Sequence, residues 1–433
     1  MPKLKIMTRT LIKDINKLEN KNVLCQGRIL NIRRMGEISF IILQDYTATI
    51  QVVWGKELSA NIGDVIELKG LVRQEERAKG GFEILGQEIK IISSSISDYP
   101  IDLSKKTINL NLNTLLNHRP LSLRHPSVQA IFKLYDLLLE GYGKTMREEG
   151  FTEIKTPKLL EAASEGGANC FKIQYFEKNA YLAQSPQFYK QIMVGVFERV
   201  FEIGSTFRAE PHFTTRHVNE YISLDAEMGF IESFYDVTAL LSRVLAKIFK
   251  DISERGAEYL AFYNVKAPEV PEKIPHLKLR EIKEIIKKEY NYKIPEKTDI
   301  DPEGERLAGK YAQEKFNSDF IFITHYPWKE KPFYTMPDPE NSEETCGFDL
   351  IFKGMEITTG SQRIHLYDKL IENMKKKNIK PDGMEFYLNS FKYAMPPHGG
   401  WGMGSERIIQ QMLGLESIKQ AILFPRDVKR LSP

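Results

Sequence analysis

The sequence predicts an α+β protein with a small N-terminal β-barrel and a larger domain in which helices flank an antiparallel sheet. Three observations lead to this prediction. Five short β-rich segments lie within residues 23–92. After residue 117, strands and helices mix without the regular βαβ rhythm of a parallel sheet. The chain of 433 residues is long enough for two or three domains at ~150 residues each.

The N-terminal segments are rich in β-branched and apolar residues and are separated by Gly, Asp and charged turns. They span Val23–Ile32, Ile38–Leu43, Ala48–Val53, Val65–Arg73 and Phe82–Ile92. So many strands in so short a stretch suggest a five-stranded barrel. An OB-fold barrel, which binds single-stranded nucleic acid on its strand face and loops, has this pattern. An unrelated small β domain is the alternative.

We predict three parts along the chain: a barrel domain at 1–100, a linker or hinge at 101–120 and a second domain at 121–433. The linker lies in Ser93–Asn117, which has a Ser run and repeated Asn-Leu. The second domain opens with apolar residues at helical spacing in Ser127–Glu149. Phe151–Pro157 then reads as a strand ended by its proline.

Composition excludes several classes of protein. No apolar stretch approaches the ~20 residues of a membrane span, and the first residues lack the apolar core of a signal peptide, so we expect a cytoplasmic protein. Cys25, Cys170 and Cys346 are far apart, which excludes a disulfide framework or a structural zinc site. The net charge of +3 comes entirely from residues 1–100 and is weak evidence for an RNA partner.

One candidate site is a predicted β-hairpin in the second domain. An apolar strand from Arg199 delivers Arg208 and Glu210 to a loop, and a second strand, Asn219–Phe230, returns from it. The loop itself ends in Arg216-His217. Arginines around such a loop are suited to polyphosphate, because a guanidinium binds phosphate oxygens in bidentate fashion. Taken alone, an arginine hairpin is more often a surface ion-pair site.

A second candidate site is the glycine-rich run Gly399–Ser405, which leads through Arg407 into a predicted helix at Ile408–Leu413. Glycines let a flat ring lie against the backbone, and Arg407 can reach phosphates or stack on a base. The chain has neither a GxxxxGK[ST] loop nor a GxGxxG turn after a strand. A bound nucleotide would therefore not be held by a P-loop or a Rossmann turn.

Together, the hairpin and the glycine-rich run resemble motifs 2 and 3 of the class II aminoacyl-tRNA synthetases, and Pro126–Pro157 is similar to motif 1. The likeness extends over nearly the whole chain. Ala183–Gln191, Phe207–Glu210 and Phe424–Asp427 resemble the archaeal-type aspartyl-tRNA synthetases. The resemblance implies a class II catalytic domain, ATP, Mg²⁺, L-aspartate and tRNA-Asp as ligands, and a homodimer with Pro157 at the subunit boundary.

The resemblance also assigns the residues around ATP. Arg208 would contact the α-phosphate, Glu210 the adenine amino group, and Arg407 the adenine ring and the γ-phosphate. The implied catalytic residues, Arg208, Glu356 and Arg407, align the reactants and neutralise charge, so no side-chain nucleophile is needed. The implied ATP-binding set is Arg208, Ala209, Glu210, Arg216, His217, Val218, Glu356, Gly404, Ser405, Glu406 and Arg407.

The same resemblance implies a metal site at Glu356 and Thr359. Magnesium takes oxygen ligands and keeps phosphates and waters, so one carboxylate and one hydroxyl are sufficient protein ligands. Without the resemblance, Glu356 reads equally well as a surface acid at a strand edge.

Lys190 and Arg363 match the residues that hold the aspartate side chain, and Glu165 matches the acid that binds its ammonium group. A cationic pocket prefers aspartate to asparagine, because an amide would leave buried positive charge unpaired. The alternative for Lys190 is an exposed position on the helix from Ser185. The implied aspartate-binding set is Glu165, Gln187, Lys190, Arg208, Thr359 and Arg363.

In the barrel, Phe40 and Gln51 match the positions that stack on and hydrogen-bond the central anticodon base, with Glu83 and Arg28 nearby. Stacking of an unpaired base on an aromatic ring contributes ~1–3 kcal/mol. The alternative for Phe40 is a barrel core position within Ile38–Leu43.

Some positions depart from the aspartyl pattern. Thr359 stands where a serine is typical, and the run from Gly360 to Arg363 resembles the asparaginyl enzymes, so an asparaginyl-tRNA synthetase is one alternative. Leu30 replaces a tryptophan of enzymes that charge only tRNA-Asp, whereas Lys79 agrees with them, which leaves charging of tRNA-Asn open. A non-catalytic RNA-binding paralogue is a further alternative, but such proteins usually lose the motif 2 and 3 arginines.

Overall fold

The structure is a computed structural model that describes residues 8–78, 80–97, 99–103, 105, 107–108, 110–161, 169–295 and 299–433. Its contacts divide the chain into two compact units, Met1–His125 and Pro126–Pro433. The finer predicted division, with a hinge at 101–120, stays a prediction. Among the described residues, no helix is long and apolar enough to cross a membrane.

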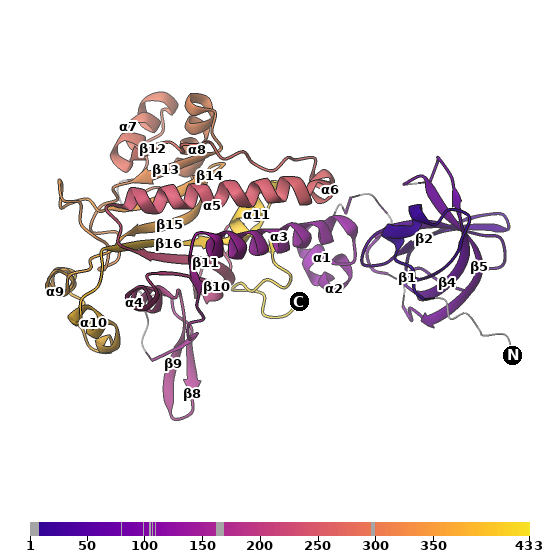
Figure 1. The fold of residues 1–433 in the computed structure, drawn as a ribbon, viewed down its shortest axis with the longest axis horizontal. Helices are drawn as coiled ribbons and strands as arrows, with labels where there is room; N and C mark the ends of the chain where they lie inside the picture. The colour runs from indigo at the N-terminus through magenta and orange to yellow at the C-terminus, as the bar shows by residue number, and fades with distance from the viewer. Residues whose placement is uncertain are drawn as a thin grey trace. The chain divides into compact units, whose positions relative to one another are not determined.

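The first unit contains a closed five-stranded barrel with the strand order β1-β2-β3-β5-β4 (Figure 1). The predicted strands are confirmed to within three residues at each end. The strands are β1 Asn22–Met35, β2 Ile38–Gln44, β3 Thr49–Trp54, β4 Val65–Gln74 and β5 Phe82–Ser93. The unit also contains η1 Ile12–Lys17, α1 Leu112–Asn117 and α2 Arg119–Ser122.

Buried and more exposed residues alternate along β2, β3 and β4, so that one face of each strand lines the barrel core. In β2, the side chains of Ile41 and Leu43 are buried in the barrel core, whereas those of Phe40 and Ile42 lie on the other face. Gly70 lets β4 and β5 approach closely at a bulge, because a Cβ there would lie 2.5 Å from the Leu85 carbonyl oxygen.

The second unit is built on an eight-stranded sheet with the order β12-β13-β14-β15-β16-β11-β10-β6. The six inner strands, β13 to β10, pair in antiparallel fashion as predicted, and the two edge strands add parallel pairs. The strands are β6 Thr152–Glu153, β10 Arg199–Phe207, β11 Glu220–Gly229, β12 His276–Lys278, β13 Phe320–Thr324, β14 Gly347–Phe352, β15 Met355–Gln362 and β16 His398–Gly404. A separate small sheet has the order β7-β9-β8, with β7 Leu159–Leu160, β8 Lys172–Tyr175 and β9 Lys178–Leu182.

Long helices cover the sheet and bury its core. Helices α3 and α5 pack against each other and run across the sheet (Figure 1). A capping box of Ser233 and Asp236 starts α5, where it satisfies backbone N–H groups that have no partner within the helix. The helices are α3 Pro126–Glu148, α4 Gln187–Phe197, α5 Phe234–Arg255, α6 Ala257–Leu260, η2 Ala261–Tyr263, α7 Leu279–Tyr290, α8 Pro302–Phe316, α9 Tyr367–Lys376, α10 Glu385–Lys392, α11 Ser405–Leu413 and η3 Ile418–Ala421.

The strand predicted at Phe151–Pro157 is much shorter in the structure. Only Thr152 and Glu153 pair as β6 with β10. Three residues further on, the amide of Thr156 donates to the Glu202 carboxylate at 3.1 Å in place of a backbone carbonyl. The Glu202 side chain thus replaces the strand ladder, and the predicted strand ends early.

Candidate active site

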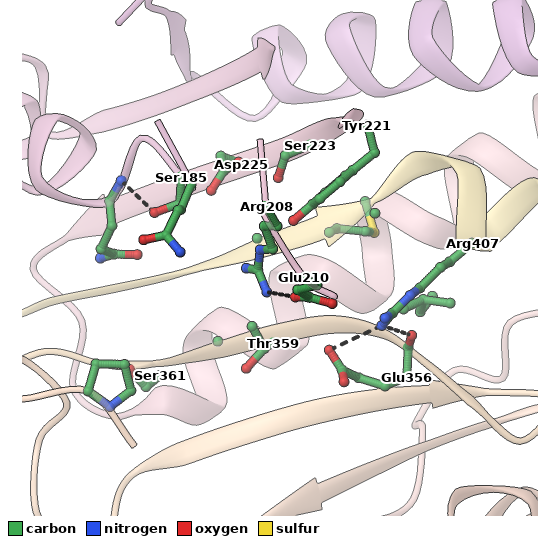
Figure 2. Close-up of a pocket in the computed structure, with 18 of the residues that line it drawn as sticks. Ser185, Arg208, Glu210, Tyr221, Ser223, Asp225, Glu356, Thr359, Ser361 and Arg407 are labelled. Carbon is green, nitrogen blue, oxygen red and sulfur yellow. Dashed lines mark hydrogen bonds and ion pairs between the residues drawn. The ribbon is translucent and has the colours of Figure 1, made fainter. Parts of the chain in front are cut away.

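A pocket of about 470 Å³ opens in the second unit over strands β11, β15 and β16. Figure 2 shows side chains from β11, from β15 and from the hairpin loop converging on it. Charged groups of both signs dominate the lining. The predicted residues that line it are Gln187, Lys190, Arg208, Glu210, Arg216, His217, Val218, Glu356, Thr359, Arg363, Gly404, Glu406 and Arg407.

The hairpin predicted from the sequence forms one wall of the pocket. Strands β10 and β11 pair from Arg199 with Met228 to Phe207 with Glu220. Beyond β10, a guanidinium nitrogen of Arg208 lies 3.8 Å from a Glu210 carboxylate oxygen, and Glu210 also lies 3.6 Å from the His217 ring. The pKa of His217 is lowered mainly by burial, against the opposing charge of Glu210.

Arg216 is fixed by a carboxylate from outside the hairpin. Its guanidinium pairs with Glu305 of α8, and Glu305 also accepts a hydrogen bond of 2.7 Å from the backbone amide of Glu356. Burial raises the pKa of Glu305, although Arg216 opposes the rise. The hairpin loop is thereby tied to strand β15, which supplies the next part of the pocket.

Arg407 and Glu356 contact each other at one side of the pocket (Figure 2). Arg407 donates to the Glu356 carbonyl oxygen at 2.8 Å, and its guanidinium lies 3.6 Å from the Glu356 carboxylate. The Glu356 side chain is 35% exposed, so its carboxylate remains open to the pocket. Arg407 lies in the first turn of α11, as predicted.

The deepest part of the pocket is a buried network of two cations and two carboxylates. The Lys190 ammonium lies 3.0 Å from Asp225 and 3.5 Å from Glu227, and it donates to the Trp401 carbonyl oxygen at 2.7 Å. Arg363 donates to Glu227 at 2.9 Å. All four charged side chains are at most 6% exposed, so each charge requires the others for compensation.

The network favours the charged forms of Glu227 and Arg363. Burial opposes ionisation of Glu227, but Arg363 and then Lys190 outweigh it and hold its pKa below the usual value. Burial lowers the pKa of Arg363, but the Glu227 charge outweighs burial and raises this pKa above its usual value. Lys190 is therefore a buried pocket residue, and its alternative placement as an exposed helix residue is wrong.

Strand β16 can pass beside this network only because it is glycine-rich. A Cβ at Gly400 would lie 2.1 Å from the Ala226 carbonyl oxygen and 2.3 Å from the Glu227 carboxylate. The Gly400 carbonyl oxygen in turn accepts a 3.2 Å hydrogen bond from Arg363. At this position the glycine thus serves close backbone packing.

The end of the second unit completes the hairpin wall. The amide of Asn219 donates to the Arg426 carbonyl oxygen at 2.8 Å, and the amide of Ile418 donates to the Thr215 carbonyl oxygen at 2.9 Å. The Phe213 ring lies between two ammonium groups, with Lys419 at 3.9 Å and Lys429 at 4.4 Å from its centroid. The hairpin loop is therefore held by residues that follow it by about two hundred positions.

Two described residues of the predicted ATP-binding set, Ser405 and Ala209, do not line the pocket. The Ser405 side chain is buried and donates to the Ile222 carbonyl oxygen. Ala209 donates its amide to the Asn169 carbonyl oxygen. Glu165 lies outside the described residues, as does Lys79 of the barrel.

Glu406 reaches the pocket, but its carboxylate is directed into the scaffold. It accepts hydrogen bonds from the Ile222 amide at 2.9 Å and from the Tyr135 hydroxyl at 3.0 Å. Burial raises its pKa to about 7. These contacts give Glu406 a role in joining α3, β11 and α11.

Three of the four predicted anticodon residues, Phe40, Gln51 and Glu83, lie together on the barrel. Gln51 donates to the Glu83 carboxylate at 2.8 Å, and Glu83 also pairs with Arg73. Phe40 pairs with Val53 of the neighbouring strand and is partly exposed. Arg28 instead donates to the Gly63 carbonyl oxygen at 2.7 Å.

The sequence prediction missed several residues that line or support the pocket. Asp225 and Glu227 were recognised only as part of a strand, although they hold the two cations. Their alternation with Ser223 along β11 was the available signal, because alternate residues of a strand face the same side. Asp349 was also missed: it is buried on β14, is bound by Lys331 at 3.1 Å and is hydrogen-bonded to Thr359.

Comparisons with known proteins agree with this architecture. Residues 111–428 match the family of class II tRNA synthetases (D, K and N), and residues 23–92 match the OB-fold nucleic acid binding domain. The aspartate–tRNA(Asp/Asn) ligase of Deinococcus radiodurans is 41% identical, with 99% of each chain covered. The aspartate–tRNA(Asp) ligase of Pyrococcus abyssi is 40% identical, with 96% of this chain and 97% of that protein covered.

Solved structures show the same fold. The asparaginyl-tRNA synthetase of Pyrococcus horikoshii, complexed with asparaginyl-adenylate, has a TM-score of 0.91 at 27% identity and covers 99% of this chain and 100% of its own. The aspartyl-tRNA synthetase of Entamoeba histolytica has a TM-score of 0.86 at 26% identity and covers 100% of this chain and 94% of its own. The chain belongs to the class II tRNA synthetases of the D, K and N group, and within that group to the family of the aspartate–tRNA ligases.

Proposed function

We propose that this protein is an aspartate–tRNA ligase, which activates L-aspartate with ATP and transfers it to the 3′ end of tRNA-Asp. The observation that carries the choice of amino acid is the buried pair of cations, Lys190 and Arg363, at the inner end of the pocket. Membership of the family supplies the reaction class, ATP as a substrate and tRNA as a partner.

Hydrogen-bond counting supports aspartate over asparagine. The Lys190 ammonium has three donors and makes two hydrogen bonds, to Asp225 and to the Trp401 carbonyl. One Arg363 terminal nitrogen, Nη1, makes a single hydrogen bond, to Ser361. Arg363 thus retains an N–H for a ligand, and a ligand would share the third Lys190 donor with Glu227, which lies 3.5 Å away. Two such donors suit the two oxygens of a β-carboxylate better than the oxygen and NH₂ of an amide.

In the first step we expect the aspartate α-carboxylate to attack the α-phosphorus of ATP, with pyrophosphate as the leaving group. Arg208 stabilises charge at the α-phosphate, while Arg216 and His217 bind the outer phosphates. Arg407 packs over adenine and reaches the γ-phosphate. In the second step the terminal ribose hydroxyl of the tRNA attacks the adenylate carbonyl and releases AMP, so that positioning and charge neutralisation provide the catalysis.

The donor set at β15 fits Mg²⁺ bound mainly through the substrate. The Glu356 side chain opens into the pocket. Thr359 lies three residues further along β15 and lines the same pocket. Magnesium takes oxygen ligands and usually keeps phosphate and water ligands, so these two side chains are sufficient protein ligands. When bound, Mg²⁺ would neutralise charge on the ATP phosphates.

On the tRNA side, we assign anticodon binding to the barrel face formed by Phe40, Gln51 and Glu83. The half-exposed ring offers a stacking surface, and the Gln51–Glu83 pair offers polar atoms beside it. Leu30, in contrast, is buried at a bulge of β1. We infer that tRNA-Asn is charged as well, since Leu30 replaces a bulky aromatic residue and the Deinococcus relative is named for both tRNAs.

Two further expectations belong to this proposal. The chain would form a homodimer through its first motif, where Pro157 is exposed next to the short strand β6. It would act in the cytoplasm, where its tRNA substrates are charged.

The proposal is tested by pyrophosphate exchange and by charging of two transcripts. We expect ATP–pyrophosphate exchange that depends on aspartate and not on asparagine, and transfer of aspartate to both tRNA-Asp and tRNA-Asn. Exchange driven by asparagine would show that the assignment of Lys190 is wrong. Charging of tRNA-Asp alone would limit the proposal to a discriminating enzyme, and absence of any exchange would favour the non-catalytic paralogue.

A further inference from the structure

A second cavity, of about 540 Å³, lies beside the active-site pocket and shares a wall with it. The shared wall is the segment from Glu330 to Tyr334, whose members Glu330, Lys331, Pro332 and Tyr334 line both cavities. The other side of the second cavity is formed by the end of α9, at Lys376, and by Lys377 and Ile379 after it. We call this second cavity the lysine groove.

Positive charge dominates the lysine groove. Its lining contains Lys329, Lys331, Lys376 and Lys377 against a single carboxylate, Glu330. Lys331 is compensated by Asp349 and Lys376 by Glu372. Lys329 is exposed and makes no ion pair with any described residue. An anionic ligand would therefore meet an excess of cations here.

An aromatic ring lies among these lysines. The Lys377 ammonium is 4.1 Å from the centroid of the Trp328 ring, and it donates to the Trp328 carbonyl oxygen at 2.6 Å. The indole nitrogen of Trp328 donates to Asn373 of α9 at 2.8 Å, which fixes the plane of the ring. Cations that follow a groove, with an aromatic ring between them, are typical of sites for single-stranded nucleic acid.

We propose that the lysine groove holds the unpaired nucleotides just before the terminal adenosine of the tRNA, while that adenosine reaches into the active-site pocket. The proposal rests on the proposed function, because only a tRNA ligase must bring an RNA 3′ end to this pocket. The shared wall makes the two cavities neighbours, as consecutive nucleotides require. Lys329 and Lys376 would contact phosphates, and Trp328 would contact a base or a ribose.

Charge reversal in the groove provides the test. The variant Lys329→Glu/Lys376→Glu changes two exposed side chains that take no part in the active-site pocket. We expect the KM for a tRNA-Asp transcript to rise roughly tenfold, with aspartate-dependent ATP–pyrophosphate exchange unchanged. The slope of log(1/KM) against log salt concentration should fall by about 1.4 in magnitude, because each contact with a single strand contributes ~0.7.

The matched control is Lys287→Glu/Lys288→Glu. These lysines are also exposed in the last turn of a helix, α7, but line neither cavity, and the control alters the net charge by the same amount. Equal KM values for groove and control variants would overturn the proposal. A second outcome would also overturn it. If the groove variant kept wild-type tRNA kinetics, and inorganic phosphate raised the Tm of the wild type but not that of the variant, the groove would be a site for small anions. Wild-type exchange with aspartate tests the proposed function separately.

Discussion

Removal of the Lys190 ammonium tests two separate roles of the buried network: its contribution to the stability of the fold and its selection of aspartate. In Lys190→Met, the side chain keeps its length and apolar stem, but Asp225 loses its cation at 3.0 Å while it remains buried. Breaking a buried ion pair by removing one partner costs about 3–5 kcal/mol. For a unit of this size that corresponds to a fall in Tm of roughly 5–8 °C.

A second substitution makes the reasoning sharper. In Lys190→Met/Asp225→Asn the orphaned charge is gone, so most of the lost stability should return. Selectivity should not return, because the missing N–H no longer binds the β-carboxylate. We expect kcat/KM for aspartate in pyrophosphate exchange to fall at least about 100-fold in both variants, as for loss of a charged hydrogen bond of about 3 kcal/mol.

The measurements are scanning calorimetry and pyrophosphate exchange with aspartate and with asparagine. The control is Lys178→Met, an exposed lysine on β9, which should change neither quantity. The reasoning would be refuted if Lys190→Met melted within 1–2 °C of wild type, or if the double variant regained aspartate activity.

Four further predictions concern other parts of the chain. Ala394 has a left-handed φ of 69°, so Ala394→Gly should raise the unfolding free energy by about 0.5–1 kcal/mol, and a lower Tm would contradict this. The pKa of Glu406 is raised by burial from 4.5 to about 7, so its contribution to stability is present below about pH 4.5 and is lost as the pH rises through about 7. That loss, up to about 3 kcal/mol, should vanish in Glu406→Gln when Tm is followed from pH 5 to 8. Glu356→Gln should lower the rate of pyrophosphate exchange about 100-fold and raise the Mg²⁺ concentration needed for half-maximal rate; an unchanged Mg²⁺ requirement would remove Glu356 from the metal site. Phe40→Ala should raise the KM for tRNA-Asp roughly tenfold and leave pyrophosphate exchange intact, whereas equal KM values would mean that the ring does not stack on a base.

Local patterns predicted the strands and helices well where one face of an element is buried. The barrel strands follow the alternation of apolar residues, and the hairpin around Arg208 appears where an apolar strand meets a polar loop. The strand at Phe151–Pro157 was overestimated, because its end is decided by the Glu202 side chain, which is distant in sequence.

The site was predictable where residue type and the resemblance to known motifs together indicate the chemistry. Arginines at 208, 216 and 407 indicated phosphate binding, and all three line the pocket. The partners of the cations were not predictable in the same way. Asp225 and Glu227 of β11 meet Lys190 because α4 packs on β11, and they meet Arg363 because the sheet order β15-β16-β11 brings the end of β15 close. Long-range pairing of this kind leaves no spacing signal in the sequence.

The docking of Arg426 and Ile418 onto the hairpin loop has a consequence for synthesis on the ribosome. The loop that carries Arg216 and His217 emerges long before the residues that hold it. A nascent chain that stops short of residue 418 therefore has the phosphate-binding side chains without their support. Incomplete products of translation should remain unable to consume ATP, and the cell is spared futile adenylate formation by unfinished enzyme.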